Sequence, residues 1–336
     1  MQLHENFSLK PYNTFGIDAK ARFFNGFSFV EELEENLMIY SQYPIFILGG
    51  GSKILFTKDY DGCVLKNEIK GIEIQHEDEE HVYVKVGAGE NWHQFVLHCI
   101  DHHWAGVENL SLIPGNVGAA PIQNIGAYGV ELYDVFWSLE AFHISERRMH
   151  TFTRVDCEFG YRDSIFKNRY KDDFAIISLT LQLRKKPIFH TSYGAITEEL
   201  EKMGVKALTI KAVSQAVINI RSSKLPDPKE IPNAGSFFKN PEVPMEKYEE
   251  LKTKFPDIVA YPLVKETVKL AAGWMIEQCG WKGYRKGDAG CHAKQALVLV
   301  NYGNAKGEEI FDLSEQILLS VNEKFGVLLE REVNII

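Results

Sequence analysis

The segment 113–132, IPGNVGAAPIQNIGAYGVEL, constrains the fold most, because it gathers glycines, prolines and alanines around the polar pair Gln123 and Asn124. Side chains this small cannot fill a core, and a loop of this length without a function is uncommon. Glycine lets the backbone approach a ligand closely and proline limits its freedom, so successive N–H groups can be held toward a phosphate or a heterocycle. We therefore expect a ligand-binding loop here rather than an ordinary connection.

The composition is that of a soluble globular chain with room for two or three domains: 336 residues, 45% hydrophobic and 25% charged. A net charge of −9 argues against a general nucleic-acid or anionic-membrane binder. No signal peptide and no stretch of roughly 18 apolar residues is visible, so we expect a cytoplasmic protein. The five cysteines lack a C-x-x-C pair, which favours reduced thiols, and no metal site is expected.

Periodicity indicates a mixture of helices and strands. Helices are expected over 29–40, after Asn91, near 212–220, over 269–279 and over 308–325. Ser28 and Glu31 are expected to form a capping box for the first helix, Asn91 to cap the second, and Gly326 to end the last. Strands are expected over 45–48, from His81, over 137–152, over 174–183 and over 296–301. Prolines and mixed charge interrupt the pattern over 222–235, where a domain junction is predicted.

Two glycine-rich turns follow predicted strands, at Gly49-Gly50-Gly51-Ser52 and at Gly87-Ala88-Gly89. A strand that ends in such a turn is typical of anion binding. Neither turn continues to G-x-G-x-x-G, and G-x-x-x-x-G-K-[ST] does not occur, so the Rossmann and P-loop interpretations have no support. The residues alone predict an α/β protein that holds a large, phosphate-bearing ligand of unspecified kind.

Six motifs give a more specific prediction: ILGGGSKILF, LSLIPGNVGAAPIQNIGAYGVEL, CEFGYRDSIFK, SSKLPDPKEIPNAGSFFKNP, HAKQALVLVN and LEREV. In this order, and covering nearly the whole chain, they resemble the UDP-N-acetylenolpyruvoylglucosamine reductase (UDP-N-acetylmuramate dehydrogenase) family, in its longer class with a tyrosine loop.

The resemblance implies an α+β fold: a two-subdomain FAD-binding fold of the vanillyl-alcohol-oxidase/PCMH type plus a C-terminal α/β substrate-binding domain. The implied boundaries are 1–67 and 68–222 for the FAD-binding subdomains, 223–327 for the UDP-sugar domain, and 328–336 for a strand that returns to the active site. The implied protein is a monomeric flavoenzyme of peptidoglycan synthesis. It takes hydride from NADPH onto flavin N5, passes it to C3 of the enolpyruvyl group of UDP-N-acetylglucosamine enolpyruvate, and yields UDP-N-acetylmuramate.

Three residues match the family's catalytic positions. Ser236 matches the proton donor to C2; a hydroxyl can serve as an acid only beside a strongly basic enolate in a preorganised site. Arg162 matches the arginine that binds the substrate carboxylate, for which a planar guanidinium is suited. Glu332 matches the catalytic glutamate, although a carboxylate near developing negative charge is repulsive unless it is protonated or orients other groups. Glu330 competes with Glu332, because residues two apart on a strand share a face.

The resemblance also implies binding residues. For FAD they are Gly49, Gly50, Gly51, Ser52, Pro114, Gly115, Gly118, Pro121, Ile122, Asn124, Gly126 and Ala127. For the UDP-sugar they are Tyr161, Tyr193, Lys224, Asn240 and Gln295, with Tyr193 beside Gly194 in a loop that closes over the nucleotide.

Two positions depart from the family pattern: Lys53 replaces a common Asn and is expected to add a phosphate contact, and Asn334 replaces an Arg and is expected to weaken one substrate contact. Two alternative functions remain open. One is another FAD-dependent oxidase or dehydrogenase that uses the same cradle for an alcohol. The other is a nucleotide-sugar binding module without turnover, which the presence of all three catalytic side chains disfavours.

Overall fold

The computed structural model describes residues 4–193, 195–263 and 266–336, so Gly194 of the expected tyrosine loop lies outside the described residues. The chain forms two compact units, each built from separate segments. The first unit comprises the chain up to Phe7, Ala21–Gly51 and Asp61–Ser223; the second comprises Ser8–Lys20, Ser52–Tyr60 and Lys224–Ile336. The second unit resumes at Lys224, within the proline-rich stretch where the sequence predicts a junction.

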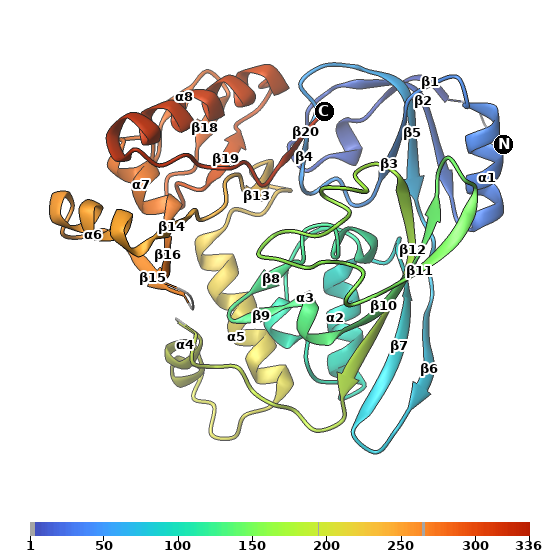
Figure 1. Ribbon diagram of the computed structural model, residues 1–336, viewed down its shortest axis with the longest axis horizontal. Coiled ribbons are helices and arrows are strands. Elements are labelled where there is room, and N and C mark those ends of the chain that lie inside the picture. Colours follow the sequence, from blue (N-terminus) through green and yellow to red (C-terminus); the bar gives the residue numbers. More distant parts are fainter. Residues whose placement is uncertain (1–3, 194, 264–265) are drawn as a thin grey trace. The chain divides into compact units, whose positions relative to one another are not determined.

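The first unit contains a four-stranded sheet, a five-stranded sheet and a two-stranded antiparallel pair of β8 (Gly126–Ala127) with β9 (Val130–Glu131) (Figure 1). The four-stranded sheet has the order β1 (His4–Ser8), β2 (Lys20–Phe27), β5 (Tyr60–Asn67), β3 (Ile45–Leu48). The five-stranded antiparallel sheet has the order β11 (Arg148–Thr153), β10 (Phe136–His143), β12 (Phe174–Arg184), β7 (His81–Gly87), β6 (Ile72–Glu77). The α-helices of the first unit are α1 (Val30–Ile39), α2 (Trp92–Asp101), α3 (Leu132–Val135), α4 (Ile196–Lys202) and α5 (Ile210–Lys224).

Strand β12 is buried on both faces and joins two cores of this unit. Leu179, Leu181 and Leu183 belong to the core that also contains the apolar side of α2, whereas Ala175 and Ile177 pack with Leu33 and other residues of α1, β2 and β5. Each buried side chain of this size contributes about 1.5–3 kcal/mol. Residues 175–179 are buried without a break, which fits a strand covered from both sides, whereas Leu181 and Leu183 alternate with the partly exposed Thr180 and Gln182.

Helix α2 begins as the sequence predicts. The Asn91 side chain accepts a hydrogen bond from the Gln94 N–H at 3.0 Å, which satisfies one of the free donors at the helix N-terminus. Helix α1 also forms, but without the capping box expected of Ser28 and Glu31: its N-cap is Phe29, and the Ser28 N–H donates instead to the Glu32 carboxylate at 2.7 Å.

The second unit contains a four-stranded sheet, a three-stranded sheet and a parallel strand pair. The four-stranded sheet has the order β13 (Asn233–Ser236), β19 (Val298–Asn301), β18 (Ala289–Cys291), β17 (Arg285–Lys286). The three-stranded sheet has the order β14 (Glu242–Pro244), β16 (Thr267–Leu270), β15 (Ala260–Pro262), and the parallel pair is β20 (Asn334–Ile335) with β4 (Ile54–Leu55). Its α-helices are α6 (Met245–Lys254), α7 (Ala272–Gln278) and α8 (Gly307–Phe325).

Helix α8 packs its apolar stripe, which includes Ile310, Ile317 and Val321, toward β18 and β19. It ends at Gly326, whose φ of 62° is left-handed, as the sequence predicts for a glycine C-cap. The helix expected over 269–279 is shorter: Lys269 and Leu270 belong to β16, and α7 begins at Ala272. Leu270 is fully buried in the sheet, so tertiary packing overrides the local helical pattern.

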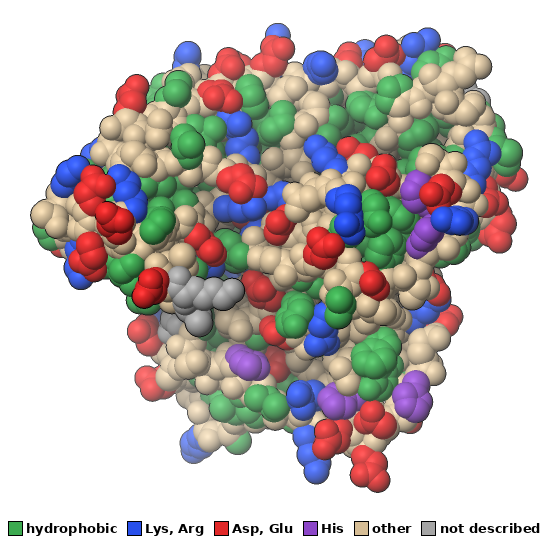
Figure 2. Space-filling view, viewed as in Figure 1, with side chains coloured by type: hydrophobic (Ala, Val, Ile, Leu, Met, Phe, Trp, Pro, Cys, Tyr) green, Lys and Arg blue, Asp and Glu red, His purple; other side chains and the backbone are tan. Residues whose placement is uncertain are grey.

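Acidic and basic side chains are interspersed over the face drawn in Figure 2. Many of them form exposed ion pairs, such as Lys254 with Glu250 at 2.7 Å, which contribute little to stability. Among the residues that the structure describes, no helix is long and apolar enough to cross a membrane. All five cysteines are free thiols.

Candidate functional site

The glycine-rich turns of the first unit approach one another backbone to backbone. A Cβ on Gly50 would lie 2.7 Å from the Cα of Gly115, and a Cβ on Gly118 would lie 2.6 Å from the Cβ of Ala88. Hydrogen bonds fix this packing: the Gly118 N–H donates to the Ala88 carbonyl at 2.9 Å, and the Trp92 N–H donates to that of Gly115 at 3.0 Å. Three turns, 49–51, 87–89 and 113–118, therefore form one surface on which side chains are excluded at positions 50 and 118.

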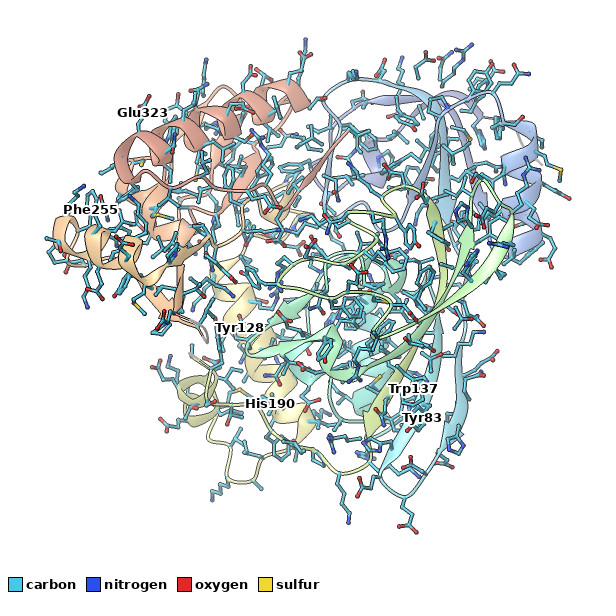
Figure 3. The ribbon with its side chains drawn as sticks, in the orientation of Figure 1. Tyr83, Tyr128, Trp137, His190, Phe255 and Glu323 are labelled. Carbon is cyan, nitrogen blue, oxygen red and sulfur yellow. The ribbon has the colours of Figure 1, made fainter. Side chains whose placement is uncertain are left out.

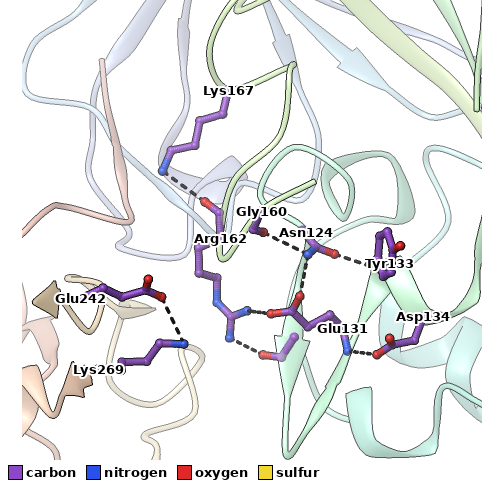
Figure 4. Close-up of polar contacts among 10 residues, drawn as sticks. Asn124, Glu131, Tyr133, Asp134, Gly160, Arg162, Lys167, Glu242 and Lys269 are labelled. Atoms are coloured by element: carbon purple, nitrogen blue, oxygen red, sulfur yellow. Dashed lines mark hydrogen bonds and ion pairs between the residues drawn. The ribbon is translucent and has the colours of Figure 1, made fainter. Parts of the chain in front are cut away.

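Asn124 connects the glycine-rich segment to the Arg162 loop (Figure 4). Its Nδ2 donates to the Glu131 carboxylate at 2.8 Å and to the Gly160 carbonyl at 3.1 Å, and its Oδ1 accepts from the Tyr133 N–H at 3.0 Å. Asn124 is 1% exposed, so these bonds satisfy a buried amide. Its side chain thus holds two segments of the candidate site together.

Arg162 lies next to this network. One guanidinium nitrogen, Nη2, donates to the carbonyl of Gly126, and Nη1 lies 3.9 Å from Oε1 of Glu131. The guanidinium carbon is 5.2 Å from the centre of the Tyr161 ring, within cation–π range. The predicted residues Asn124, Gly126, Tyr161 and Arg162 are therefore close together, with a positive charge held at the edge of the glycine-rich segment.

Several residues of this region adopt left-handed backbone conformations that favour glycine. The φ values are 41° at Asn124, 50° at Tyr128 and 53° at Arg162. Such conformations cost of order 1–3 kcal/mol each and concentrate at active sites and ligand-binding sites. The strain supports a functional role for this segment.

The predicted tyrosine loop lies beside the same segment. The ring of Tyr193 is 6.3 Å from that of Tyr128 in an edge-to-face arrangement, and Tyr193 is 53% exposed. Asn109 fixes the loop, because its Nδ2 donates to the carbonyls of Tyr128 at 3.0 Å and His190 at 2.8 Å; Figure 3 labels Tyr128 and His190. An exposed aromatic ring at this position is available to a ligand.

A second cluster of predicted residues lies within the second unit. Nζ of Lys53 donates to the backbone carbonyl of Ser236 at 2.6 Å and lies 3.0 Å from Oε1 of Glu332. The side chains of Lys53 and Glu332 are 24% and 10% exposed, so the pair is largely shielded from water. Ser236 and Glu332 thus share one cation.

Backbone pairing brings these distant residues together. The Glu332 N–H donates to the Phe237 carbonyl at 2.8 Å, and the Lys239 N–H donates to the Glu330 carbonyl at 2.9 Å, so 330–332 runs antiparallel to 237–239. Two residues later, the Asn334 N–H donates to the carbonyl of Lys53 at 2.9 Å. The C-terminal segment therefore pairs with both the Ser236 strand and the Lys53 segment.

The same contacts separate Glu332 from Glu330, which sequence spacing leaves equivalent. Glu330 pairs with Lys239 at 2.7 Å and its side chain is 64% exposed, whereas that of Glu332 is 10% exposed. Of the two carboxylates, only Glu332 is desolvated and close to Ser236. Lys53 contacts Glu332 and Ser236, and the phosphate contact expected of it stays a prediction.

Two of the predicted sugar-binding residues meet at the start of α7. Oδ1 of Asn240 accepts from the Ala272 N–H at 3.0 Å, and a Cβ on Gly273 would lie 3.3 Å from Oε1 of Gln295. Lys224 is exposed at the C-terminal end of α5. Asn240 and Gln295 therefore both lie near the start of α7, and among the described residues no hydrogen bond or ion pair joins Lys224 to either of them.

Sequence reasoning missed Arg221, a guanidinium on the inner face of α5. Its Nε donates to the Leu112 carbonyl at 3.2 Å, and burial lowers its pKa. A signal was present, since Arg221 follows the buried Val217 by four residues and so shares its helix face. A buried cation beside the glycine-rich segment favours an anionic ligand.

The glycine-rich backbone and the partly shielded guanidinium groups of Arg162 and Arg221 are typical of the class of proteins that bind a large anionic ligand. Comparison with known proteins specifies that class. Residues 30–145 match the FAD binding domain model, and residues 227–336 match the C-terminal domain model of UDP-N-acetylenolpyruvoylglucosamine reductase. Proteins of that name from Flavobacterium johnsoniae and Amoebophilus asiaticus are each 52% identical to this chain, with 100% of both chains covered. The chain belongs to the UDP-N-acetylenolpyruvoylglucosamine reductase family.

A further relative and a solved structure agree with this assignment. The protein of that name from Pseudomonas putida is 46% identical, covering 100% of this chain and 99% of its own. The crystal structure of the reductase from Thermus caldophilus aligns with a TM-score of 0.69 at 24% identity, over 100% of this chain and 99% of that one. With the mixed helices and strands, these matches confirm the predicted α+β fold with an FAD-binding part.

The residues present fit the cofactor. The matched domain contains all three glycine-rich turns, which Gly50 and Gly118 allow to pack closely together. A glycine-rich backbone of this kind is one that a phosphate-bearing group can approach. Arg221, which donates to the Leu112 carbonyl next to the glycine-rich segment, supplies positive charge. FAD is therefore the cofactor for which the first unit is built.

Proposed function

We propose that this chain reduces UDP-N-acetylglucosamine enolpyruvate to UDP-N-acetylmuramate with NADPH, in peptidoglycan precursor synthesis. The balance is one hydride to C3 of the enolpyruvyl group and one proton to C2, with NADPH converted to NADP⁺. The full-length relatives named for this reaction support it. When bound, FAD supplies the hydride-carrying chemistry between NADPH and the sugar nucleotide.

The cofactor is held by backbone groups of the glycine-rich surface. We assign Gly49, Gly50, Gly51 and Ser52 to its pyrophosphate, because this turn directly follows strand β3, which ends at the buried Leu48. The remaining contacts come from the second glycine-rich segment, in its residues Pro114, Gly115, Gly118, Pro121, Ile122, Asn124, Gly126 and Ala127. Burial of the Asn124 side chain in internal hydrogen bonds favours a role through its backbone and through the loop that it fixes.

Ser236 delivers the proton to C2. Its backbone is fixed by β13, which pairs with β19, and by the Lys53 ammonium on its carbonyl. Among the described residues, no hydrogen bond of the Ser236 hydroxyl is found, so this group is available to substrate. A fixed hydroxyl can act as an acid toward a carbanion because the orientation is already set.

Arg162 binds the substrate carboxylate and stabilises the charge that spreads onto it. The Gly126 carbonyl and Glu131 orient the guanidinium, and a planar fork suits a carboxylate. Glu332 orients the groups around Ser236 rather than protonating substrate, since its carboxylate is already paired with Lys53. The UDP-sugar is proposed to be bound by Tyr161, Tyr193, Lys224, Asn240 and Gln295.

The domain boundaries, the monomeric state and the cytoplasmic location remain proposals. We infer that 1–67 and 68–222 hold FAD, that 223–327 holds the UDP-sugar, and that 328–336 returns to the active site. The pairing of 330–334 with both Phe237 and Lys53 supports the last of these. Five free thiols support a reducing compartment.

One observation carries the mechanism: Ser236 and Glu332, far apart in sequence, meet at Lys53. The test is Ser236→Ala, examined in two half-reactions under anaerobic conditions. We expect NADPH to reduce the bound flavin at the wild-type rate, whereas reoxidation by the enolpyruvyl UDP-sugar slows by about 10²-fold or more. Ser41→Ala, at an exposed serine after α1, is the control. Equal reoxidation rates for wild type and Ser236→Ala would remove Ser236 as the acid.

A further inference from the structure

The side chain of Lys53 cross-links three segments of the second unit. Its ammonium contacts the carbonyl of Ser236 at 2.6 Å and the carboxylate of Glu332 at 3.0 Å. Its backbone is held as well, because the carbonyl of Lys53 accepts from the Asn334 N–H at 2.9 Å and β4 pairs with β20 from the next residue onward. Both ends of the residue are therefore fixed to the Ser236 and Glu332 segments.

The environment makes this ion pair sensitive to the loss of one partner. A shielded carboxylate without its cation is strongly destabilised, whereas an exposed pair contributes little. The chain offers an internal comparison two residues away, since Glu330 pairs with Lys239 at 2.7 Å but remains 64% exposed. The charge on Lys53 is therefore expected to stabilise the Glu332 carboxylate more than the charge on Lys239 stabilises the exposed carboxylate of Glu330.

Lys53 also directly follows the glycine-rich turn 49–52, which is assigned to the cofactor. Its Nζ bonds the main chain of Ser236, so displacement of Lys53 would move the strand end that carries the hydroxyl. Misplacement of a reacting group by 1 Å is enough to slow a reaction about 10²-fold. A single lysine is thus in a position to set the geometry of both the acid and the neighbouring carboxylate.

We propose that Lys53 is a positioning residue, whose ammonium holds Ser236 and Glu332 in the arrangement needed to protonate substrate. The inference rests on the proposed function for its kinetic part and on the structure alone for its coupling part. Lys53 touches neither the reacting carbon nor the hydride donor in this scheme. Its removal should therefore affect substrate reoxidation and leave flavin reduction by NADPH unchanged.

The kinetic test uses the FAD-loaded protein and the variants Lys53→Met and Lys53→Arg. We expect Lys53→Met to reduce reoxidation by the enolpyruvyl UDP-sugar about 10- to 100-fold, with NADPH reduction at the wild-type rate. Lys53→Arg keeps a charge and donors and should recover most of the rate. Lys58→Met, at an exposed lysine of the same unit, is the control. Wild-type reoxidation in Lys53→Met would overturn the proposal, as would equal losses in both half-reactions.

A double-mutant cycle of melting temperatures tests the coupling between Lys53 and Glu332 without enzyme turnover. Lys53→Met should lower the melting temperature by about 5 °C or more. Adding Glu332→Gln should restore part of that loss, because the shielded carboxylate that has lost the Lys53 ammonium is then neutral. Adding Glu330→Gln should restore nothing. Additive losses for positions 53 and 332 would overturn the proposal. If Lys53→Met does not fold, Lys53→Gln, which retains a donor but no charge, serves in both tests.

The two tests separate the two claims. If substrate fails to reoxidise the reduced wild-type protein, the proposed function is wrong, and the cycle still decides whether Lys53 and Glu332 are coupled. If substrate reoxidises the wild type but Lys53→Met behaves identically, the function stands and the role of Lys53 is wrong.

Discussion

The two units hold their candidate catalytic charges by different means. In the first unit, Arg162 is positioned mostly by main chain: the Gly126 carbonyl binds its guanidinium, and its own φ is 53°. In the second unit, Glu332 is positioned by a side chain, the ammonium of Lys53 at 3.0 Å. A site held by backbone should fail when a Cβ is added, whereas a site held by an ion pair should respond to the removal of charge.

The largest expected effect breaks the backbone-built site of the first unit. Gly50→Ala would place a Cβ 2.7 Å from the Cα of Gly115 and 3.0 Å from its carbonyl carbon. Both are main-chain atoms that cannot rotate away, so the two glycine-rich turns must separate. We expect FAD affinity to fall at least 100-fold, which corresponds to about 2.7 kcal/mol. The measurement is FAD titration by absorbance, with circular dichroism to verify folding.

Gly49→Ala is the matched comparison. Its added methyl would meet the Cβ of Ala119 at 3.8 Å, an ordinary contact, so a smaller loss is expected. If Gly50→Ala retains wild-type affinity for FAD, the close approach of the turns has no role in cofactor binding.

The sequence predicted the local features of both units more fully than their long-range contacts. The Asn91 cap of α2 and the Gly326 end of α8 depend on residues within one turn of the helix, and both are confirmed. The helix expected from Lys269 was wrong at its start, because pairing of β16 with β14 and β15 lies outside any local pattern. Local chemistry is more often readable from a window of residues than sheet pairing is, although the local capping box expected of Ser28 and Glu31 does not form.

The candidate site residues show the same difference between local and long-range features. Motif resemblance selected Ser236, Glu332 and Arg162, but it could not show that Lys53 bonds two segments that lie far along the chain. The resemblance marked Lys53 only as a departure from the family pattern that was expected to contact a phosphate. The pairing of residues 330–334 with two distant segments creates this contact, and no periodicity in the sequence encodes it.

A smaller effect is expected from Arg162→Lys, which keeps the positive charge but removes the planar guanidinium group. A lysine cannot donate to the Gly126 carbonyl and approach Glu131 with a planar group at the same time. We expect kcat/KM for the enolpyruvyl UDP-sugar to fall about 10- to 100-fold, with FAD retained. Steady-state kinetics with bound-flavin spectra measure both quantities.

The control for this variant is Arg169→Lys, whose pair with Glu158 is exposed by 64% and 61% and should be nearly silent. Wild-type kcat/KM in Arg162→Lys would mean that the charge alone suffices. The first unit would then resemble the second in relying on charge rather than on a fixed geometry.

The smallest expected effect sharpens the comparison through a second buried carboxylate. Glu108 in the first unit is 2% exposed and accepts the Gly106 N–H at 2.6 Å. Unlike Glu332, it forms no ion pair with a lysine or arginine among the described residues. Burial therefore raises the pKa of Glu108, so its contribution to stability is present at low pH and is lost as pH rises through the folded-state pKa.

Glu108→Gln removes this titration while keeping an oxygen for Gly106. The quantity of interest is the free energy of unfolding of Glu108→Gln minus that of wild type. This difference should rise by about 1 kcal/mol between about pH 4, near the unfolded carboxyl pKa, and neutral pH. Urea unfolding across that range measures the difference, with Glu35→Gln at an exposed position of α1 as control. A difference independent of pH would show that Glu108 has the same proton occupancy in both states. In that case main-chain donors alone would stabilise a buried carboxylate in the first unit as fully as Lys53 does in the second.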